Sequence, residues 1–294
     1  MVREPDSERR ARLERRFLED AARHGYTARF PKGPYAPSDW RERIVGEVES
    51  AVAEGTRLVV ALGGDGTIGA CAEGVANTNA ALAVVPRGAA NLFARALGIP
   101  FGFEAALDVA FFGSEASVDI AWANGRVVVT MAGIGVDAAV VGATTATSKS
   151  VLGWLGYGLS TLPHLYDRPH RYEMQFDDGT VMTVDALTVV VANVGLLPAG
   201  LLLSPWTRPD DGLLDVAVLA PRGPLGWAAV FWGMLQSGRR GIPDRHLMSR
   251  QTHAVAISAD GALPRQLDGE PIAPSNELDV RVAERALTVR LPRK

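Results

Sequence analysis

Two adjacent glycines, an aspartate and a threonine follow an apolar run and could hold a phosphate group. Residues 58–67 are LVVALGGDGT, and a helical pattern follows them. Glycines let the backbone approach a phosphate, and free N–H groups at a helix N-terminus attract anions. Asp65 could lie near a magnesium ion or fix the loop, and Thr67 offers a hydroxyl. The P-loop lysine and the dinucleotide-fingerprint spacing are both absent, so an ordinary strand-to-helix turn is an equal alternative.

A second strand-to-helix turn follows in the segment VVPRGAANLFARALGIP, residues 84–100. It passes through Gly88 and enters a helix that carries Asn91 and Arg95 on neighbouring turns of one face. Open α/β sheets bind ligands at the carboxyl ends of their parallel strands. We therefore expect both glycine turns to converge on one edge of a parallel sheet.

Two carboxylates occur close together near the C-terminus, in the segment LDGEPI at residues 267–272. The residues alone fit a plain hairpin turn, because Asn-Gly and Asp-Gly pairs favour such turns. Four such pairs lie between strand-like runs: Asn124-Gly125, Asp178-Gly179, Asp260-Gly261 and Asp268-Gly269.

The elements that would position these residues alternate between helix and strand in the first half of the chain. We expect helices near 7–24, 38–55, 68–76, 89–97 and 103–111, with strands at 26–30, 57–62 and 81–86. From about residue 116, short alternating runs predict an antiparallel β-sandwich with a helical insertion near 148–165. The predicted architecture is an α/β domain, residues 1–116, and a β-sandwich domain, residues 117–294, whose last residues could pack back on the first.

Composition and charge narrow the function classes. The chain has 294 residues and a formal net charge of -3, without the basic field that nucleic-acid binding requires. Cys71 is the only cysteine, so an intramolecular disulfide is excluded and a cytoplasmic protein is expected. We find no secretory signal pattern and no apolar run long enough to span a membrane.

Five segments occur in an order that resembles the diacylglycerol kinase catalytic-domain family. They are GGDGT, PRGAANLFARALGIP, AGIGVDA, DDGLLDV and LDGEPI, spread over most of the chain from about residue 57. The family includes bacterial diacylglycerol kinases, sphingosine kinases and ceramide kinases. GGDGT alone is shared with NAD kinases, which leaves an NAD kinase-type enzyme as an alternative, but the ordered set is specific to the lipid kinases.

The resemblance implies an ATP-dependent lipid kinase. The α/β domain would be the nucleotide-binding domain, the β-sandwich would carry the lipid site, and the active site would lie in the cleft between the two domains. Asp268 would be the general base and Glu270 would lie beside it. Asn193 and Asp137 could line the cleft. The residues that would hold the ATP phosphates are Gly63, Gly64, Asp65, Gly66, Thr67, Gly88 and Asn91. In the family, acidic residues near the second domain belong to a magnesium-linked network, which here would comprise Asp119, Asp211 and Asp215.

The chain departs from the family pattern at three places. The family's first strand with its Asn-Pro turn is missing, Ala89 replaces a threonine, and Arg208 stands where an acidic residue is expected. A non-catalytic lipid-binding relative is therefore a further alternative. The resemblance implies a lipid substrate met at the inner membrane face, and a homodimer remains open. Apolar segments at 151–162, 195–203 and 225–235 could contact acyl chains or the membrane, or could belong to the core.

Overall fold

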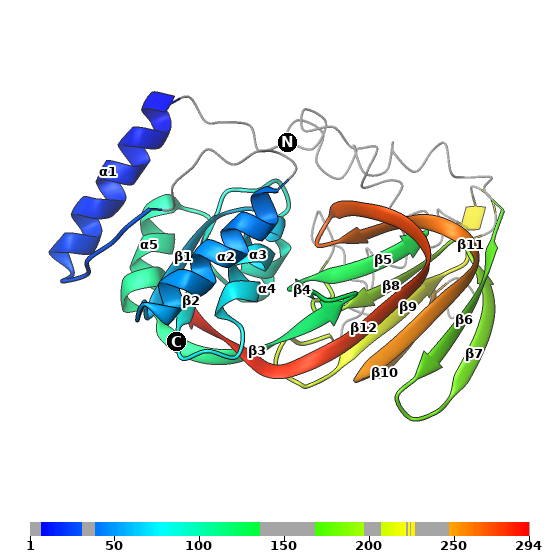
Figure 1. The fold of residues 1–294 in the computed structure, drawn as a ribbon. Coiled ribbons are helices and arrows are strands. Elements are labelled where there is room, and N and C mark those ends of the chain that lie inside the picture. The colour runs from blue at the N-terminus through cyan, green and yellow to red at the C-terminus, as the bar shows by residue number, and fades with distance from the viewer. Residues whose placement is uncertain are drawn as a thin grey trace.

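The computed structural model describes residues 7–30, 39–135, 168–196, 207–221, 223, 225–226 and 247–293. An α/β half built from the N-terminal segment adjoins a β half built from the rest of the chain (Figure 1). The α/β half contains α1 (Ser7–Arg23), α2 (Trp40–Ala53), α3 (Asp65–Val75), α4 (Leu92–Ala96) and α5 (Phe103–Phe112).

The strands form one hydrogen-bonded network in the order β1-β2-β12-β11-β5-β8-β9-β10, in which β3 and β4 extend from β12 and β6 and β7 extend from β11. β1 pairs with β2 in parallel, and β2 pairs with β12 in parallel. The other pairings are antiparallel. The first six strands are β1 (Leu58–Gly63), β2 (Ala81–Pro86), β3 (Ser114–Ala123), β4 (Arg126–Val128), β5 (Met131–Gly135) and β6 (His170–Phe176). The others are β7 (Val181–Ala186), β8 (Thr188–Ala192), β9 (Leu214–Leu219), β10 (Leu247–Thr252), β11 (Ala254–Leu267) and β12 (Glu270–Leu291).

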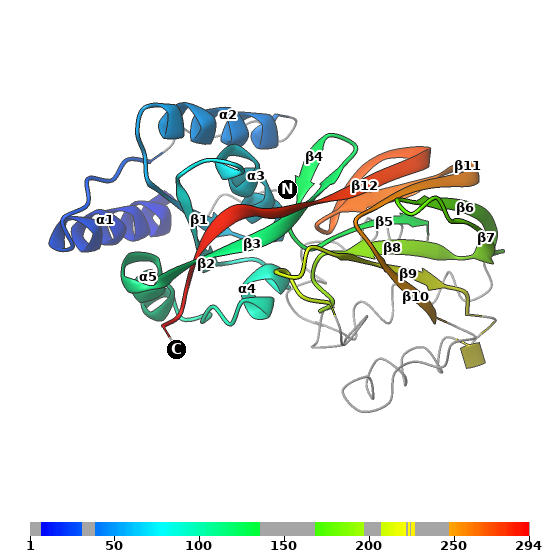
Figure 2. The same ribbon diagram turned by 90° about the horizontal axis from the view of Figure 1, so that it is seen from below.

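The strand β12 connects the two halves. Its beginning pairs with β11 in the sandwich, and its end pairs with β3 and, through Thr288 and Val289, with β2 (Figure 2). Leu287 and Val289 are buried in one core with Leu82 and Phe93 of the α/β half. A second core fills the sandwich and includes Tyr172. Because β12 is hydrogen-bonded on both sides of the junction, it fixes the Asp-Gly turn at its start relative to the glycine turns.

Three of the four predicted hairpin turns are confirmed, and the fourth is wrong. Residues 124–125 connect β3 to β4, residues 178–179 connect β6 to β7, and residues 268–269 connect β11 to β12. Asp260 and Gly261 instead lie inside β11, where the pairing register shifts between Ser258 and Leu263. There β11 leaves its partner β6 and goes on to pair with β5, so the pair marks a strand irregularity and not a reversal.

Local predictions in the α/β half also need correction. Residues 26–30 form no strand, although their composition predicted one. α3 begins at Asp65, three residues earlier than predicted, and α4 covers only Leu92–Ala96 because the second glycine turn extends to Asn91. The helical insertion predicted near 148–165 lies outside the described residues.

Candidate active site

The two glycine turns lie against each other at the carboxyl ends of β1 and β2. The N–H of Arg87 donates to the carbonyl of Gly63 at 2.8 Å. A Cβ on Gly88 would lie 2.5 Å from the Cα of Gly64, and a Cβ on Gly64 would lie 3.0 Å from the Cα of Gly88. Only residues without a side chain permit this backbone contact. The predicted convergence of the two turns is confirmed.

Asp65 joins the first turn to the second. Its carboxylate accepts hydrogen bonds from the N–H groups of Leu92 and Phe93, both at 3.0 Å, at the start of α4. Burial raises the pKa of Asp65, whereas these N–H groups lower it. Of the two roles predicted for this side chain, contact with a magnesium ion or fixing of the loop, the hydrogen bonds support the second.

Asn91 gives the second turn its shape. Its backbone has a φ of 49°, a left-handed conformation that asparagine tolerates. The side-chain Oδ1 accepts the N–H of Gly88 at 2.7 Å, and Nδ2 donates to the carbonyl of Gly88 at 2.8 Å. Both polar atoms of the amide are thus bonded to the turn, and contact of Asn91 with a nucleotide stays a prediction.

The N-terminus of α3 offers backbone donors next to these turns. The helix starts after Gly64, whose carbonyl accepts the N–H of Ile68 at 3.0 Å. The N–H groups of Gly66 and Thr67 belong to the first turn and therefore have no intrahelical acceptor. A Cβ on Gly63 would lie 2.6 Å from the Cβ of Thr67, so a glycine there leaves room for the threonine side chain. Such a helix start is suited to binding a phosphate group.

Asp268 is a buried carboxylate of the predicted site. It lies in the β11–β12 turn with a φ of 50°, and its side chain is buried. One carboxylate oxygen accepts the N–H and hydroxyl of Thr130, at 2.7 and 2.6 Å, and the N–H of Met131 at 3.3 Å. The other accepts the N–H of Val129 at 3.0 Å. These donors hold the carboxylate in a single position.

Burial has the largest effect on the pKa of this carboxyl group. It raises the pKa of Asp268 to about 6, although hydrogen bonds from Thr130 and Val129 favour the charged form. The negative charge of Asp65 raises the pKa further. A carboxyl group with a pKa near neutrality can accept a proton and release it again under physiological conditions, as a general base must.

The β11–β12 turn brings both predicted catalytic carboxylates against α3. A Cβ on Gly69 would lie 2.8 Å from Oδ2 of Asp268, and a Cβ on Gly66 would lie 2.1 Å from Oε1 of Glu270. Glycine at both helix positions makes room for these side chains. Asp268 and Glu270 therefore lie beside the helix whose N-terminus forms the glycine loop, although about 200 residues separate them from it along the chain.

Two other residues support Asp268. Only one of them, Asn193, was predicted from the sequence to lie at the site. Thr130, between β4 and β5, donates twice to Asp268, and no motif around it pointed to this contact. Asn193 was predicted to line a cleft, but it is fully buried after β8. Its Nδ2 donates to the carbonyls of Asp119 and Val129 at 3.0 and 3.1 Å. Asn193 thus supports the backbone that holds Asp268.

The three acidic residues predicted to bind magnesium lie close enough to affect one another electrostatically. Burial raises the pKa of Asp211, and the charges of Asp215 and Asp119 raise it further. Both oxygens of Asp119 accept backbone N–H groups, from Gly212 at 2.7 Å and from Arg285 at 2.6 Å. Among the residues that the structure describes, no three His, Cys, Asp or Glu side chains are arranged to hold a metal. The described residues therefore give no support to a three-carboxylate magnesium site, and that assignment stays a prediction.

Asp119 instead stabilises an irregularity in β12. Arg285 has a φ of 49° and lies where the pairing of β12 with β3 shifts register. We expect Asp119→Asn to lower the free energy of unfolding by about 1–3 kcal/mol, because one backbone N–H then faces an amide NH₂. Urea denaturation would measure this, with Asp108→Asn on the exposed face of α5 as the matched control. Equal stability of the two variants would contradict this role.

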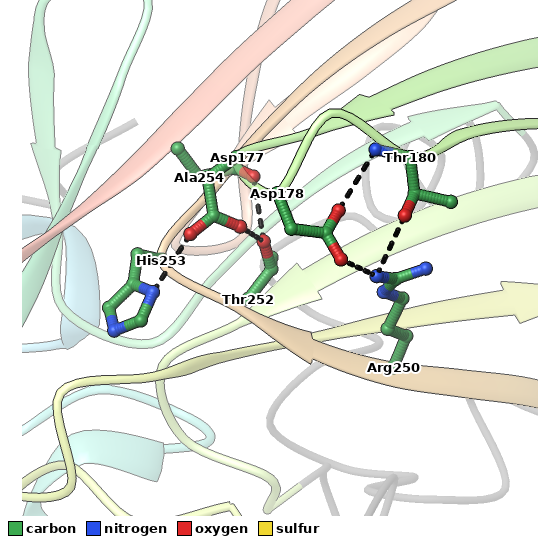
Figure 3. Close-up of polar contacts among 7 residues, drawn as sticks. All are labelled: Asp177, Asp178, Thr180, Arg250, Thr252, His253 and Ala254. Atoms are coloured by element: carbon green, nitrogen blue, oxygen red, sulfur yellow. Dashed lines mark hydrogen bonds and ion pairs between the residues drawn. The ribbon is translucent and has the colours of Figure 1, made fainter.

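A second polar cluster lies away from this site and ties the β6–β7 hairpin to β10 (Figure 3). Asp177 accepts the hydroxyl of Thr252 and pairs with Nδ1 of His253 at 2.8 Å. Asp178 pairs with Arg250. The hydrogen bond from Thr252, followed by the one from His253, has the largest effect in lowering the pKa of Asp177 below its usual value. His253 is exposed at the surface of the protein.

Other predicted positions lie outside the described residues. Asp137 and the apolar segment 151–162 are among them, as are most of the segments 195–203 and 225–235. In the part of the chain that is described, no helix is both long and apolar enough to cross a membrane.

Comparisons with known proteins agree with this architecture. The family model described as the diacylglycerol kinase catalytic domain matches residues 15–123. The model described as the YegS C-terminal NAD kinase beta sandwich-like domain matches residues 130–291. Together they confirm the predicted combination of an α/β domain and a β-sandwich.

Individual proteins are also similar over most of their length. A protein named "Probable lipid kinase YegS-like" from Pseudomonas aeruginosa (strain UCBPP-PA14) is 34% identical over 250 residues, which cover 83% of this chain and 80% of that protein. A protein of the same name from Pseudomonas savastanoi pv. phaseolicola (strain 1448A / Race 6) is 33% identical over 256 residues, covering 85% and 80%. The crystal structure of a diacylglycerol kinase from Bacillus anthracis str. Sterne is similar with a TM-score of 0.67 at 18% identity, covering 94% of this chain and 91% of that one.

Proposed function

Because this chain belongs to the diacylglycerol kinase family of lipid kinases, we propose that it transfers the γ-phosphate of ATP to the hydroxyl of a lipid alcohol. One observation carries the proposal. A buried carboxylate, Asp268, with a pKa of about 6, lies against the helix whose N-terminus follows the glycine loop. A carboxylate that can accept a proton therefore lies close to N–H groups that can donate hydrogen bonds to a phosphate, as phosphoryl transfer requires.

The glycine turns provide the features that a nucleotide phosphate needs. The first-turn N–H groups of α3 have no intrahelical acceptor, and the helix dipole favours a negative charge there. Gly64 and Gly88 let the two turns lie directly against each other. We propose that the loop from Gly63 to Thr67 holds the ATP phosphates, and that Asp65 and Asn91 keep both turns in position through the hydrogen bonds described above.

Asp268 would act on the attacking hydroxyl. In its ionised form the carboxylate accepts the hydroxyl proton while the alcohol oxygen forms a bond to the γ-phosphorus and the bond to the β–γ bridging oxygen breaks. The products are a lipid phosphate and ADP. The N–H groups of Val129 and Thr130 keep the carboxylate from rotating away. Glu270 lies beside Gly66. With the phosphates on the glycine loop, it would lie near them and orient the acceptor hydroxyl.

Magnesium would accompany ATP as its counter-ion and neutralise phosphate charge. The group Asp119, Asp211 and Asp215 does not offer the geometry of a separate site, so no step of the reaction depends on it. The lipid is proposed to be a diacylglycerol or a sphingoid base, met at a membrane surface. Both classes present a hydroxyl group on an apolar tail.

The dependence of the rate on pH follows from the same carboxylate. Since burial raises the pKa of Asp268 to about 6, the base is mostly ionised at pH 7 and mostly protonated at pH 5. We expect kcat/KM to fall about tenfold for each pH unit below 6 and to level off above 7. A rate profile between pH 4.5 and 8 measures this. A profile that stays flat down to pH 5 would contradict the assignment of Asp268 as the base.

The function itself is tested with γ-labelled Mg·ATP and a panel of lipid alcohols in mixed micelles. The panel contains a diacylglycerol, a monoacylglycerol and a sphingoid base, and NAD is included as a non-lipid acceptor. Label in a lipid phosphate is the expected result. Label in NAD would replace the proposal with an NAD kinase. Binding of ATP or lipid without transfer of label would favour a non-catalytic relative.

A further inference from the structure

A buried arginine lies next to the proposed base, although no motif of the sequence pointed to it. Arg41 belongs to the first turn of α2, and only 7% of its surface is exposed. Its Nη2 donates to Oε2 of Glu73 at 3.0 Å and to the carbonyl of Val127 at 2.9 Å. The same oxygen of Glu73 accepts the N–H of Val127 at 3.1 Å. These three bonds hold the guanidinium in one place between α2, α3 and β4.

The guanidinium and the Asp268 carboxylate approach the same point on α3. A Cβ on Gly69 would lie 2.8 Å from Oδ2 of Asp268, 3.6 Å from Nη1 of Arg41 and 3.8 Å from Nη2. Apart from the residues adjacent to Gly69 and the backbone of α3, these are the three nearest atoms, and the Glu73 carboxylate is not among them. Because Gly69 has no side chain, nothing on α3 separates the positive group from the negative one at this point.

The surroundings of Asp268 give this positive charge its importance. Among the described residues, three acidic groups lie around this position: Asp65 and Glu73 on α3 and Glu270 on β12. The thiol of Cys71, also on α3, has a pKa raised to about 12 by burial and stays neutral. An arginine remains protonated even when it is buried, so its charge is permanent.

We propose that Arg41 is a positioning residue for Asp268: its guanidinium, fixed by Glu73 and Val127, faces the carboxylate across Gly69 and favours the charged form that accepts the substrate proton. This inference rests on the proposed role of Asp268 and adds the group that counteracts its burial. Arg41 does not touch the reacting atoms. Glu73 provides the second carboxylate that lets a permanent charge be buried at this position.

Replacing the arginine separates an electrostatic role from a structural one. With Arg41→Met, loss of the positive charge raises the pKa of Asp268 by about one unit. The acid limb of kcat/KM then moves from about pH 6 to about pH 7. The variant is about fivefold slower than wild type at pH 6 and within about twofold at pH 8. Arg126→Met is the matched control, because Arg126 forms an exposed ion pair with Glu42. An acid limb that stays at its wild-type position overturns the proposal.

A second measurement does not depend on kinase activity. The protein is labelled with ¹³C at aspartate carboxyl carbons, and the Asp268 signal is identified by its loss in Asp268→Asn. Its titration should shift upward in Arg41→Met whether or not any lipid is phosphorylated. The chain could therefore fail as a lipid kinase while the contact between Arg41 and Asp268 is confirmed.

The double variant Arg41→Gln/Glu73→Gln covers the case in which Arg41→Met does not fold. Both charges disappear together, so no unpaired Glu73 remains buried, and glutamine can still donate to the Val127 carbonyl. If the guanidinium of Arg41 lies closer to Asp268 than the Glu73 carboxylate does, the pKa of Asp268 rises in the double variant too. The rise is smaller than in the single variant, because a negative charge is removed together with the positive one. An unchanged titration in the double variant means that Arg41 serves only as the counter-ion of Glu73, and it overturns the proposal.

Discussion

Asp268→Asn is expected to lower kcat for lipid phosphorylation by about 10²- to 10⁴-fold, the usual contribution of a general base. The amide cannot accept the hydroxyl proton at any accessible pH, so the acid limb near pH 6 should also disappear from the residual rate. The substitution leaves the glycine turns in place, and KM for ATP should therefore stay within about threefold of wild type. Transfer of the γ-label from Mg·ATP to the preferred lipid of the panel measures both constants.

The same substitution also disturbs hydrogen bonds, and the controls must allow for that. The carboxylate accepts N–H groups on both of its oxygens, from Val129 on one and Thr130 on the other. The NH₂ group of asparagine meets one of these donors, which costs about 1–3 kcal/mol of unfolding free energy. Asp279→Asn, at an exposed position of β12, is the matched control for a charge removed from the same strand. A folded Asp268→Asn variant with more than a tenth of the wild-type kcat would remove Asp268 from the role of base.

The glycine turns could be predicted because they depend on local chemistry. A strand followed by glycines and a helix places its turn at the carboxyl edge of a parallel sheet. The parallel pairing of β1 with β2 then brings Gly64 and Gly88 into contact. The Asp268-Gly269 hairpin was predictable for a similar reason, since both residues must adopt positive φ in a two-residue turn.

The same local rule failed at Asp260-Gly261 because strand pairing outweighed it. β11 continues through this pair and changes partner from β6 to β5. Turn propensity describes what a dipeptide favours alone, whereas the strand pairing of the residues before and after this pair keeps the chain running in one direction. Residues 26–30 show the reverse case, in which a strand-like composition forms no strand.

The surroundings of the proposed base could not be predicted from the sequence. Arg41, Thr130 and Asp268 come from three distant parts of the chain and meet only because β12 carries the Asp-Gly turn against α3. No spacing rule connects such positions. Asp119 is a second example, because nothing in the sequence predicts that its carboxylate accepts backbone N–H groups from Gly212 and Arg285.

Gly88→Ala is expected to raise KM for ATP at least tenfold. A Cβ at this position would lie 2.5 Å from the Cα of Gly64 and 2.9 Å from Oδ1 of Asn91, so the two turns must separate. Overpacking of this kind typically costs about 1–3 kcal/mol of unfolding free energy. Because Asp268 is not in contact with Gly88, kcat at saturating ATP should change less than KM.

Three alanine variants form a graded series that ties this effect to the contact between the turns. At Gly64 the added Cβ would lie 3.0 Å from the Cα of Gly88, so Gly64→Ala should raise KM for ATP by less than Gly88→Ala does. At Gly46, in α2, a Cβ meets nothing within 4 Å, and alanine should stabilise the helix by up to about 1 kcal/mol without changing KM. Steady-state kinetics with varied ATP, together with urea denaturation, would establish the order. If Gly88→Ala binds ATP like Gly46→Ala, the nucleotide phosphates do not lie on these turns, and the donors at the start of α3 have another ligand.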